Sequence, residues 1–472
     1  MKITSLLLIV GLWASVIEAE ETIRIGIGTQ DTTINCATGG AVVRALHLLE
    51  KYLPHEGKYK DVKYDIVWHN FTSGPPLNSE LLANKLDIGN MADFPAVLGA
   101  TAFQTANNGV HTLYIANLCG SVSGAGNAVV VPIQSSIQSF SELRGKRISV
   151  PMGSTGHAML LRAILDQGWD PNRDVTIVNQ SPEVAGSALK ANQIDAHADF
   201  VPFGELFPFR GIARKIYDGS SSGMTTTHGV QVRSDFAAKY PELVVAYLKA
   251  TLEADRLMRE HPEDLCEKLY QWTGVEAEVC YAFHGPEGIQ TRDYTLKPEF
   301  IRAIRHAVVT LRELKKTNQE VNVDAFVTDV YIRRAAKEMG LDYDARLKDY
   351  SAVPFEGPAE DTGRPIADPK LAGQIWIKGE TKVRLFTAPE ATIRAALKAE
   401  AAGKVVRVVY VQDRETGNKL FADRAWYVQT GGELAAFASK ASADSWAARY
   451  AGKEMTYAEV RNSLATGIAK TG

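Results

Sequence analysis

Short apolar strands alternate with helices along most of the chain. Thr22–Gly28 has the alternating pattern of a strand, and the polar loop Thr29–Gly40 separates it from a helix that runs to Leu53. Similar strand and helix patterns recur through residues 64–118, and the alternation starts again at Ala128. This order of elements predicts an α/β fold.

Two segments rich in glycine and serine, Cys119–Gly126 and Gly219–Gly223, interrupt the alternation. Two α/β units that meet at such connections suggest two lobes with a cleft between them, and we expect a hinge there. The predicted lobe one consists of residues 20–120 and 225–345, because the later strand and helices complete the first unit. The predicted lobe two consists of residues 121–224.

One loop in the second unit lies between a strand and a helix. Ile148–Val150 is a β-branched run, Gly153–Gly156 is the loop, and Met159–Leu165 is apolar at helical spacing. Backbone N–H groups and the hydroxyls of Ser154 and Thr155 at a helix N-terminus can bind an anion or a carbonyl-like group. The alternative interpretation is that one of these two hydroxyls caps the helix.

Length, charge and the first residues limit the class of protein. The chain has 472 residues and a net charge of −3, which argues against nucleic-acid binding. Met1–Ala19 combines a lysine, an apolar run and small residues, as a cleaved secretory signal peptide does. Since no later stretch reaches the roughly 18 apolar residues of a membrane span, we expect a periplasmic protein without a direct membrane span.

Four cysteines fit an oxidising compartment. Cys266 and Cys280 flank a Trp-Thr-Gly turn between two helical stretches, and we predict a disulfide between them. Cys36 and Cys119 each follow a strand, and they could form a second disulfide or remain buried thiols.

An ordered set of motifs resembles the nitrate/sulfonate/taurine-type substrate-binding proteins of ABC importers. The resemblance covers about residues 22–345, and the segments that carry it are Ala128–Pro132, Ser136–Pro151, Gly153–His157, Gln193–Ala196 and Asp235–Val244. It implies a type II periplasmic-binding fold, in which two lobes close on a small-molecule ligand and present it to a membrane ABC permease.

The resemblance also implies which loops contact the ligand. They correspond here to Gln30–Thr33, Asn90–Phe94, Cys119–Ser123, Gly153–His157, Ala198–Phe200 and Thr225–His228. From these loops we select as candidate substrate-binding residues Gln30, Asp31, Thr32, Asn90, Asp93, Ser154, Thr155, His157, Asp199 and Thr226. Each acidic residue among them could instead be a helix cap or a turn residue.

These loops contain acidic residues but no lysine or arginine. A site for a fully anionic ligand normally uses a guanidinium or an ammonium group. The composition of the loops therefore favours a zwitterion, a cationic amine or a neutral polar solute over a simple anion.

A rival hypothesis is an envelope protein that handles copper or a metal complex. Soft or borderline ligands lie in or next to the predicted cleft loops, namely Cys36, Met91, Cys119, Met152, His157, His197, Met224 and His228. They form no compact metal-binding motif, and methionines in loops often only fill space. We therefore predict no metal site and no cofactor.

The sequence offers little support for catalysis. It contains no G-x-S-x-G, Walker or H-E-x-x-H motif. Ser154 and His157 could be a nucleophile and a base, but no third group to orient them is evident. We therefore expect a protein that is not an enzyme.

The C-terminal region has a different character. Residues 346–372 are rich in proline and read as a linker, and residues 373–472 have the pattern of a small α+β domain. Trp426–Val460 is similar to the NosL family, whose members are linked to copper delivery. Gly431 and Gly432 stand where that family has Met and His, so a docking or structural role is the safer interpretation.

Overall fold

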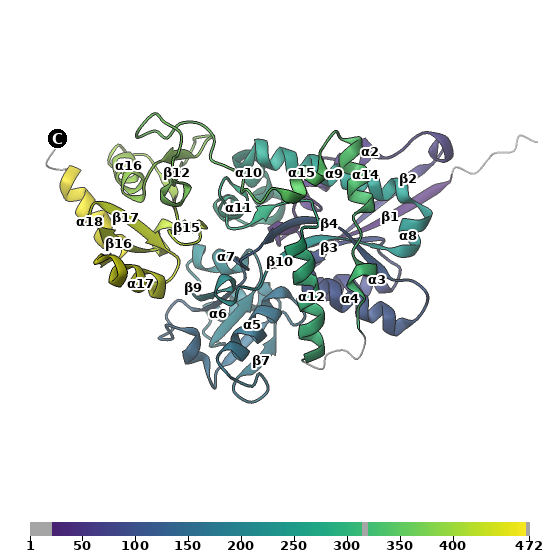
Figure 1. Ribbon diagram of the computed structural model, residues 1–472, viewed down its shortest axis with the longest axis horizontal. Helices are drawn as coiled ribbons and strands as arrows, with labels where there is room; N and C mark the ends of the chain where they lie inside the picture. Colours follow the sequence, from purple (N-terminus) through teal and green to yellow (C-terminus); the bar gives the residue numbers. More distant parts are fainter. Residues whose placement is uncertain (1–20, 314–319, 469–472) are drawn as a thin grey trace, which may run out of the picture.

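The computed structural model describes residues 21–313 and 320–468, so the predicted signal peptide lies outside the described residues. Figure 1 shows two α/β parts that lie against each other and a third, C-terminal part beside them. We call the part built on a six-stranded sheet lobe one and the part built on a five-stranded sheet lobe two. Their strands come from the segments that the sequence predicted for each lobe.

Lobe one contains a mixed sheet with the strand order β11-β4-β10-β3-β1-β2. In chain order the strands are β1 (Thr22–Thr29), β2 (Lys63–Asn70), β3 (Ile88–Ala92), β4 (Thr112–Ser121), β10 (Thr226–Arg233) and β11 (Thr291–Arg292). The strand β10 returns from lobe two and runs antiparallel between β3 and β4. Both segments of lobe one are therefore needed to complete its sheet.

Helices cover both faces of this sheet, as Figure 1 shows. They are α1 (Ala41–Ala45), α2 (Leu48–Tyr52), α3 (Gly74–Leu82), α4 (Asp93–Ala106), α8 (Ser234–Lys239), α9 (Pro241–Glu260), α10 (Pro262–Thr273), α11 (Ala277–His284), α12 (Pro298–Glu313), α13 (Val323–Phe326), α14 (Val330–Glu338) and α15 (Tyr343–Lys348). Ile23, Ile25 and Ile27 of β1 are buried, as the alternation in the sequence predicted.

Lobe two contains the strand order β7-β6-β8-β5-β9. Its strands and helices are β5 (Ala128–Pro132), β6 (Arg147–Val150), α5 (Thr155–Asp166), β7 (Thr176–Asn179), α6 (Pro182–Lys190), β8 (Ala196–Asp199), α7 (Phe203–Phe209) and β9 (Ala213–Asp218). The β6–α5 unit is the strand, loop and helix that the sequence predicted.

Two chain crossings join the lobes, one from β4 to β5 and one from β9 to β10. They lie side by side, since the backbone N–H of Gly219 donates to the carbonyl oxygen of Asn127 at 2.7 Å. Gly124 has a φ of +87°, and a Cβ placed on it would lie 2.2 Å from the carbonyl oxygen of Met224. The first crossing therefore needs glycine at this position.

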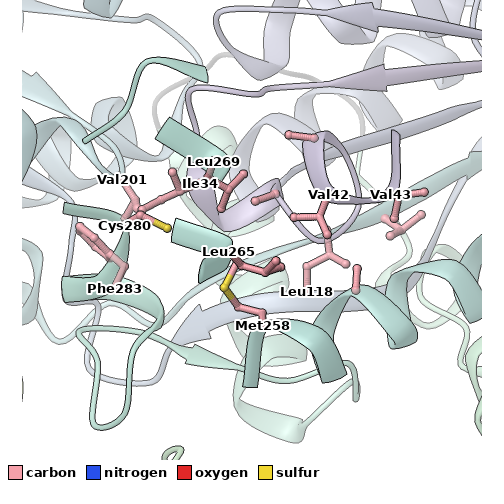
Figure 2. Close-up of a cluster of buried hydrophobic side chains, with 14 of the residues drawn as sticks. Ile34, Val42, Val43, Leu118, Val201, Met258, Leu265, Leu269, Cys280 and Phe283 are labelled. Carbon is pink, nitrogen blue, oxygen red and sulfur yellow. The ribbon is translucent and has the colours of Figure 1, made fainter. Parts of the chain in front are cut away.

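The lobes also share apolar contacts. Val201, which precedes α7 of lobe two, lies in one buried cluster with Cys280 and Phe283 of α11 in lobe one (Figure 2). Arg210, next to α7, donates to the carboxylate of Glu276 before α11 at 2.8 Å. The segment around α7 thus contacts lobe one beside the first crossing, because a Cβ on Gly126 would lie 2.8 Å from Cγ2 of Val201 and 3.0 Å from Cε1 of Phe283.

The C-terminal domain is an α+β unit of two small antiparallel sheets and three helices among the described residues. Its elements are β12 (Gly373–Ile377), β13 (Arg384–Phe386), α16 (Pro389–Ala401), β14 (Val406–Gln412), β15 (Lys419–Phe421), β16 (Trp426–Thr430), β17 (Glu433–Phe437), α17 (Lys440–Tyr450), β18 (Lys453–Met455) and α18 (Tyr457–Ile468). Gly431 and Gly432 form the β16–β17 turn with φ values of +52° and +127°. Glycine suits these positions because it adopts positive φ without strain.

The predicted disulfide is not formed in the structure. Cys266 of α10 and Cys280 of α11 lie side by side, with their sulfur atoms 2.8 Å apart, but both are free thiols. Cys36 and Cys119 are also free and buried, in agreement with the second of the two alternatives for this pair. The sequence placed Cys266 and Cys280 together correctly, and the bond between them stays a prediction.

Candidate ligand-binding cleft

The two lobes are in contact across the cleft that lies between them. A Cβ on Gly153 of lobe two would lie 3.0 Å from Cγ of Pro75 and 3.1 Å from Cδ1 of Leu98, both in lobe one. The rings of His157 and Phe94 face each other edge-on across the lobes, with their centroids 6.4 Å apart. The structure therefore shows a closed conformation.

A small cavity remains where the lobes meet. It measures about 20 Å³, which is room for about one water molecule. Lobe one contributes Asp93 and Phe94 of α4, Thr226 of β10 and His306 of α12, while lobe two contributes Thr155 and Met159 of α5. The cavity is thus lined by side chains of both polar and apolar character, from both lobes.

Asp93 is the buried acid of this cavity. Its carboxylate accepts a hydrogen bond from the backbone N–H of Phe94 at 2.7 Å. Burial raises the pKa of Asp93 to about 7, against the hydrogen bonds that favour the charged form. Asp93 therefore changes its charge close to neutral pH.

The hydroxyl of Thr226 is a second polar group in the cavity. Its oxygen is buried and has no hydrogen-bond partner in the structure. A buried hydroxyl without a partner is unfavourable, and a bound polar molecule can supply the missing hydrogen bond. Thr155 lies across from it with its hydroxyl 3.5 Å from the side-chain oxygen of Asn127.

In the loop before α5, one of the two hydroxyls that the sequence singled out, that of Ser154, caps the helix. Ser154 is the N-cap residue, and its hydroxyl oxygen accepts a hydrogen bond from the backbone N–H of His157 at 3.2 Å. Nδ1 of His157 accepts a hydrogen bond from the backbone N–H of Gly153 at 3.2 Å. Thr155, rather than Ser154, lines the cavity.

The predicted site residues at the end of β1 hold lobe one together. Gln30 donates from Nε2 to the carbonyl oxygen of Asn90 at 2.9 Å, and Thr32 is half-buried beside it. Asp31 accepts a hydrogen bond from Arg44 at 2.7 Å. Asp31 is thus paired within its own lobe, and its selection as a substrate-binding residue stays a prediction.

Asn90 and Asp199 are similarly engaged. Asn90 donates from Nδ2 to the hydroxyl of Tyr247 at 2.8 Å, inside lobe one. Asp199 accepts hydrogen bonds from Nε2 of His197 at 2.7 Å and from the backbone N–H of Phe200 at 2.8 Å. His197 in turn lies 2.8 Å from the hydroxyl of Ser149. The side chains of Ser149, His197 and Asp199 are all buried. Their hydrogen bonds therefore order the interior of lobe two.

The rival hypothesis of a metal site requires several ligands close together. In residues 21–313 and 320–468, no group of three or more His, Cys, Asp or Glu side chains is placed to hold a metal ion. Burial raises the pKa of the Cys119 thiol to about 12 and lowers the pKa of His228 to about 3. Nδ1 of His228 lies 3.1 Å from Nδ2 of Asn35.

Several cavity residues were missed by the sequence analysis. Met159 lies one turn into α5, and Ala303, His306 and Ala307 belong to α12, far along the chain. The amphipathic pattern of α12 predicts a helix with one buried face. The pattern does not indicate which residues of α12 approach lobe two, because this approach depends on how the lobes close.

No helix in the described part of the chain is both long and apolar enough for a membrane span. The site is a closed cleft between two lobes, with polar groups from each lobe and no lysine or arginine among the residues that line its cavity.

Comparisons with known proteins identify two families. Residues 93–265 match the family model described as NMT1/THI5 like, and residues 366–465 match the NosL family model. The taurine-binding periplasmic protein of Escherichia coli (strain K12) is 30% identical over 202 residues, which are 42% of this chain and 59% of that protein. It is named as a binding protein and not as an enzyme.

Solved structures have the same fold. The alkanesulfonate-binding protein SsuA from Xanthomonas axonopodis pv. citri, bound to MOPS, is 23% identical, with a TM-score of 0.54 over 66% of this chain and 100% of that chain. The periplasmic nitrate-binding protein NrtA from Synechocystis PCC 6803 is 14% identical, with a TM-score of 0.51 over 71% and 93%. The chain therefore has the fold of these binding proteins, and it is similar to the NMT1/THI5-like family over residues 93–265 and to the NosL family over residues 366–465.

Proposed function

We propose that this protein is the solute-binding component of an ABC importer, and that it captures one small polar solute by closing its two lobes. The observation that carries the proposal is the cavity lined by Asp93 and Thr226 of one lobe and Thr155 of the other. Because this cavity has room for about one water molecule, a solute enters only when the lobes separate, and they then close around it less tightly than in this structure. The bound solute is then delivered to a membrane permease.

We further propose the cellular setting that the sequence predicts. Residues 1–19 direct export and are removed, and the mature protein works in the periplasm. The lobes are residues 20–120 with 225–345 and residues 121–224, followed by the linker 346–372 and the domain 373–472. In that oxidising compartment the adjacent thiols of Cys266 and Cys280 form a disulfide.

The solute is a zwitterion, an amine or a neutral polar molecule rather than a simple anion. The cavity presents a carboxyl group, hydroxyls, an amide and the imidazole of His306, and no lysine or arginine lines it. A simple anion close to the charged form of Asp93 would be repelled, whereas an ammonium group would be attracted. Taurine carries both an ammonium and a sulfonate group and so fits this description better than nitrate does.

A thermal-shift panel tests the proposal on the full mature chain. Taurine, methanesulfonate, ethylamine, nitrate and glycine betaine are added separately, because a ligand that binds the native state raises the melting temperature. We expect stabilisation by taurine or ethylamine, none by methanesulfonate or nitrate, and a smaller shift in a Thr226→Val variant. Stabilisation by nitrate or methanesulfonate alone would contradict the proposed solute class.

Small-angle scattering tests lobe closure with the compound that gives the largest shift. The radius of gyration should decrease on addition of that compound, and the binding curve from scattering should agree with that from calorimetry. If the radius of gyration stays constant while the compound binds, closure is not the mechanism of capture.

A further inference from the structure

The C-terminal domain is attached to lobe one by specific hydrogen bonds. The hydroxyl of Tyr410 donates to the carbonyl oxygen of Glu278 at 2.7 Å, and Nε2 of Gln374 donates to the hydroxyl of Tyr281 at 2.9 Å. Arg407 donates to the carboxylate of Glu278 at 2.7 Å. Both lobe-one residues are in α11, so β12 and β14 of the domain are docked on that helix.

Aromatic packing makes this attachment rigid. The ring centroid of Tyr281 lies 5.4 Å from that of Trp376 and 5.6 Å from that of Tyr410. All three side chains are at most 1% exposed. Together with the hydrogen bonds to Glu278 and Tyr281, this close packing fixes the domain to α11 of lobe one.

The same domain also contacts lobe two. The ring centroid of Phe421, at the end of β15, lies 5.4 Å from that of Phe209, the last residue of α7. The guanidinium carbon of Arg424 lies 5.8 Å from the centroid of the same Phe209 ring. Figure 1 shows the C-terminal domain beside both α11 and α7. We call the contact of Phe421 and Arg424 with Phe209 the clamp.

We propose that the clamp holds lobe two in the closed position and thereby raises the affinity of the cleft for its solute. The C-terminal domain is fixed to lobe one, and Phe209 moves with lobe two. A rotation of lobe two therefore separates Phe209 from Phe421 and Arg424, unless the rotation axis passes through the clamp. Since the clamp is formed in the closed conformation, it favours that conformation.

The effect on binding follows from the populations of the two conformations. The solute binds with the lobes drawn together around it, so the apparent dissociation constant rises as the fraction of molecules with separated lobes grows. An aromatic pair of this kind changes a two-state equilibrium by up to about tenfold. The clamp thus acts on affinity although none of its residues lines the cavity. This effect on affinity rests on the proposed function, whereas the effect on closure does not.

The closure test uses the full chain without any solute. Spin labels are placed on exposed positions of each lobe by Lys60→Cys and Asn172→Cys, and their separation is measured by pulsed electron paramagnetic resonance. Phe209→Ala should shift the distance distribution away from the closed form and broaden it. Phe209→Leu, which keeps part of the apolar contact, should give an intermediate distribution.

A matched control removes an aromatic contact of similar size inside lobe two. The rings of Trp169 and Phe140 stack with centroids 5.9 Å apart, and neither belongs to the clamp. Trp169→Ala should leave the label separation unchanged. Equal distributions for wild type and Phe209→Ala, or equal changes in Phe209→Ala and Trp169→Ala, would overturn the proposal.

The affinity test uses the compound identified by the thermal-shift panel. Phe209→Ala should weaken its binding by about two- to tenfold, with no such change in Trp169→Ala. If no compound binds wild type, the proposed function fails but the label separations still decide the clamp. If closure changes in Phe209→Ala and the affinity does not, the part of the proposal that concerns binding is overturned.

Discussion

Lys419 places an amino group inside the boundary between the C-terminal domain and lobe one. The side chain is fully buried, and its Nζ contacts the side-chain oxygen of Gln374. It also lies 4.8 Å from the ring centroid of Tyr281. Burial lowers the pKa of Lys419 to about 7, although nearby carboxylates and the hydrogen bond favour the charged form.

Lys419 should make the stability of the protein depend on pH above neutrality. Between pH 7 and the ordinary lysine pKa of 10.5, the unfolded chain keeps a proton that the folded chain has released. The free energy of unfolding should therefore rise with pH in this range, by at most about 1.4 kcal/mol per pH unit. In Lys419→Met this rise should be smaller, as urea unfolding at pH 7, 8 and 9 will measure. Parallel pH profiles for the two proteins would show that Lys419 keeps its ordinary pKa.

Asp93 should have the opposite effect on the acid side. The folded protein keeps the proton on Asp93 up to about pH 7, whereas the unfolded chain releases it near 3.8. The stabilisation is complete below pH 3.8 and is lost as pH rises through 7, so the free energy of unfolding should decrease over this range. Asp93→Asn removes this contribution, and the difference in urea midpoints between variant and wild type at pH 5 and pH 7.5 will measure it. A difference that does not vary with pH would contradict the raised pKa.

At the scale of elements, α5 begins at the point where the lobes meet. Ser154 caps its first turn, while Thr155 lines the cavity. The same turn therefore combines a structural residue with a candidate binding residue. Substitutions of the two neighbouring hydroxyls should separate stability from binding.

Ser154→Ala should reduce the free energy of unfolding by about 1 kcal/mol, since it removes the hydrogen bond that the N–H of His157 donates to the Ser154 hydroxyl. Ser187→Ala, on the exposed face of α6, is the control and should change it by less than about 0.5 kcal/mol. Chemical denaturation at neutral pH measures both. Equal losses in the two variants would mean that the cap does not stabilise α5.

The crossings should respond to substitution according to the space around each glycine. Gly124 and Gly223 both have positive φ, but a Cβ on Gly124 would lie 2.2 Å from the carbonyl oxygen of Met224, and a Cβ on Gly223 would meet nothing within 4 Å. Gly223→Ala should reduce the free energy of unfolding by about 1 kcal/mol, because alanine is strained at positive φ although it meets no neighbour. Gly124→Ala should cost clearly more, because the neighbouring crossing has to move. Melting temperatures of the two variants compare them, and a larger loss in Gly223→Ala would contradict this account.

At the scale of the whole molecule, local patterns predicted the fold well and the site only in part. Alternating apolar positions predicted β1, and glycines at the crossings predicted the division into lobes. The pairing of Asp31 with Arg44 and the approach of His306 to the cleft depend on packing between distant segments, which no local pattern encodes. The clamp also could not be predicted from a local pattern, because Phe209 and Phe421 are more than 200 residues apart in the sequence.

Removal of the C-terminal domain should expose a part of the lobe-one core. Tyr281, which is 1% exposed in the full chain, loses Trp376 and Tyr410 as neighbours when residues 353–472 are deleted. We expect the truncated protein to bind the dye ANS strongly and to aggregate at lower temperature than the full chain. A truncated protein as soluble and as stable as the full chain would show that this boundary is not a shared core.

The position of β10 has a consequence for how the chain folds as it emerges during synthesis. The N-terminus comes first, but the sheet of lobe one lacks an inner strand until residue 233 has followed. Until then β3 and β4 have open edges, which are sites where strands of other chains add and aggregate. Lobe two, made from one continuous segment, has no such delay. The sheet of lobe one is therefore still incomplete while lobe two can already fold, and a chaperone that covers open strand edges would act in this interval.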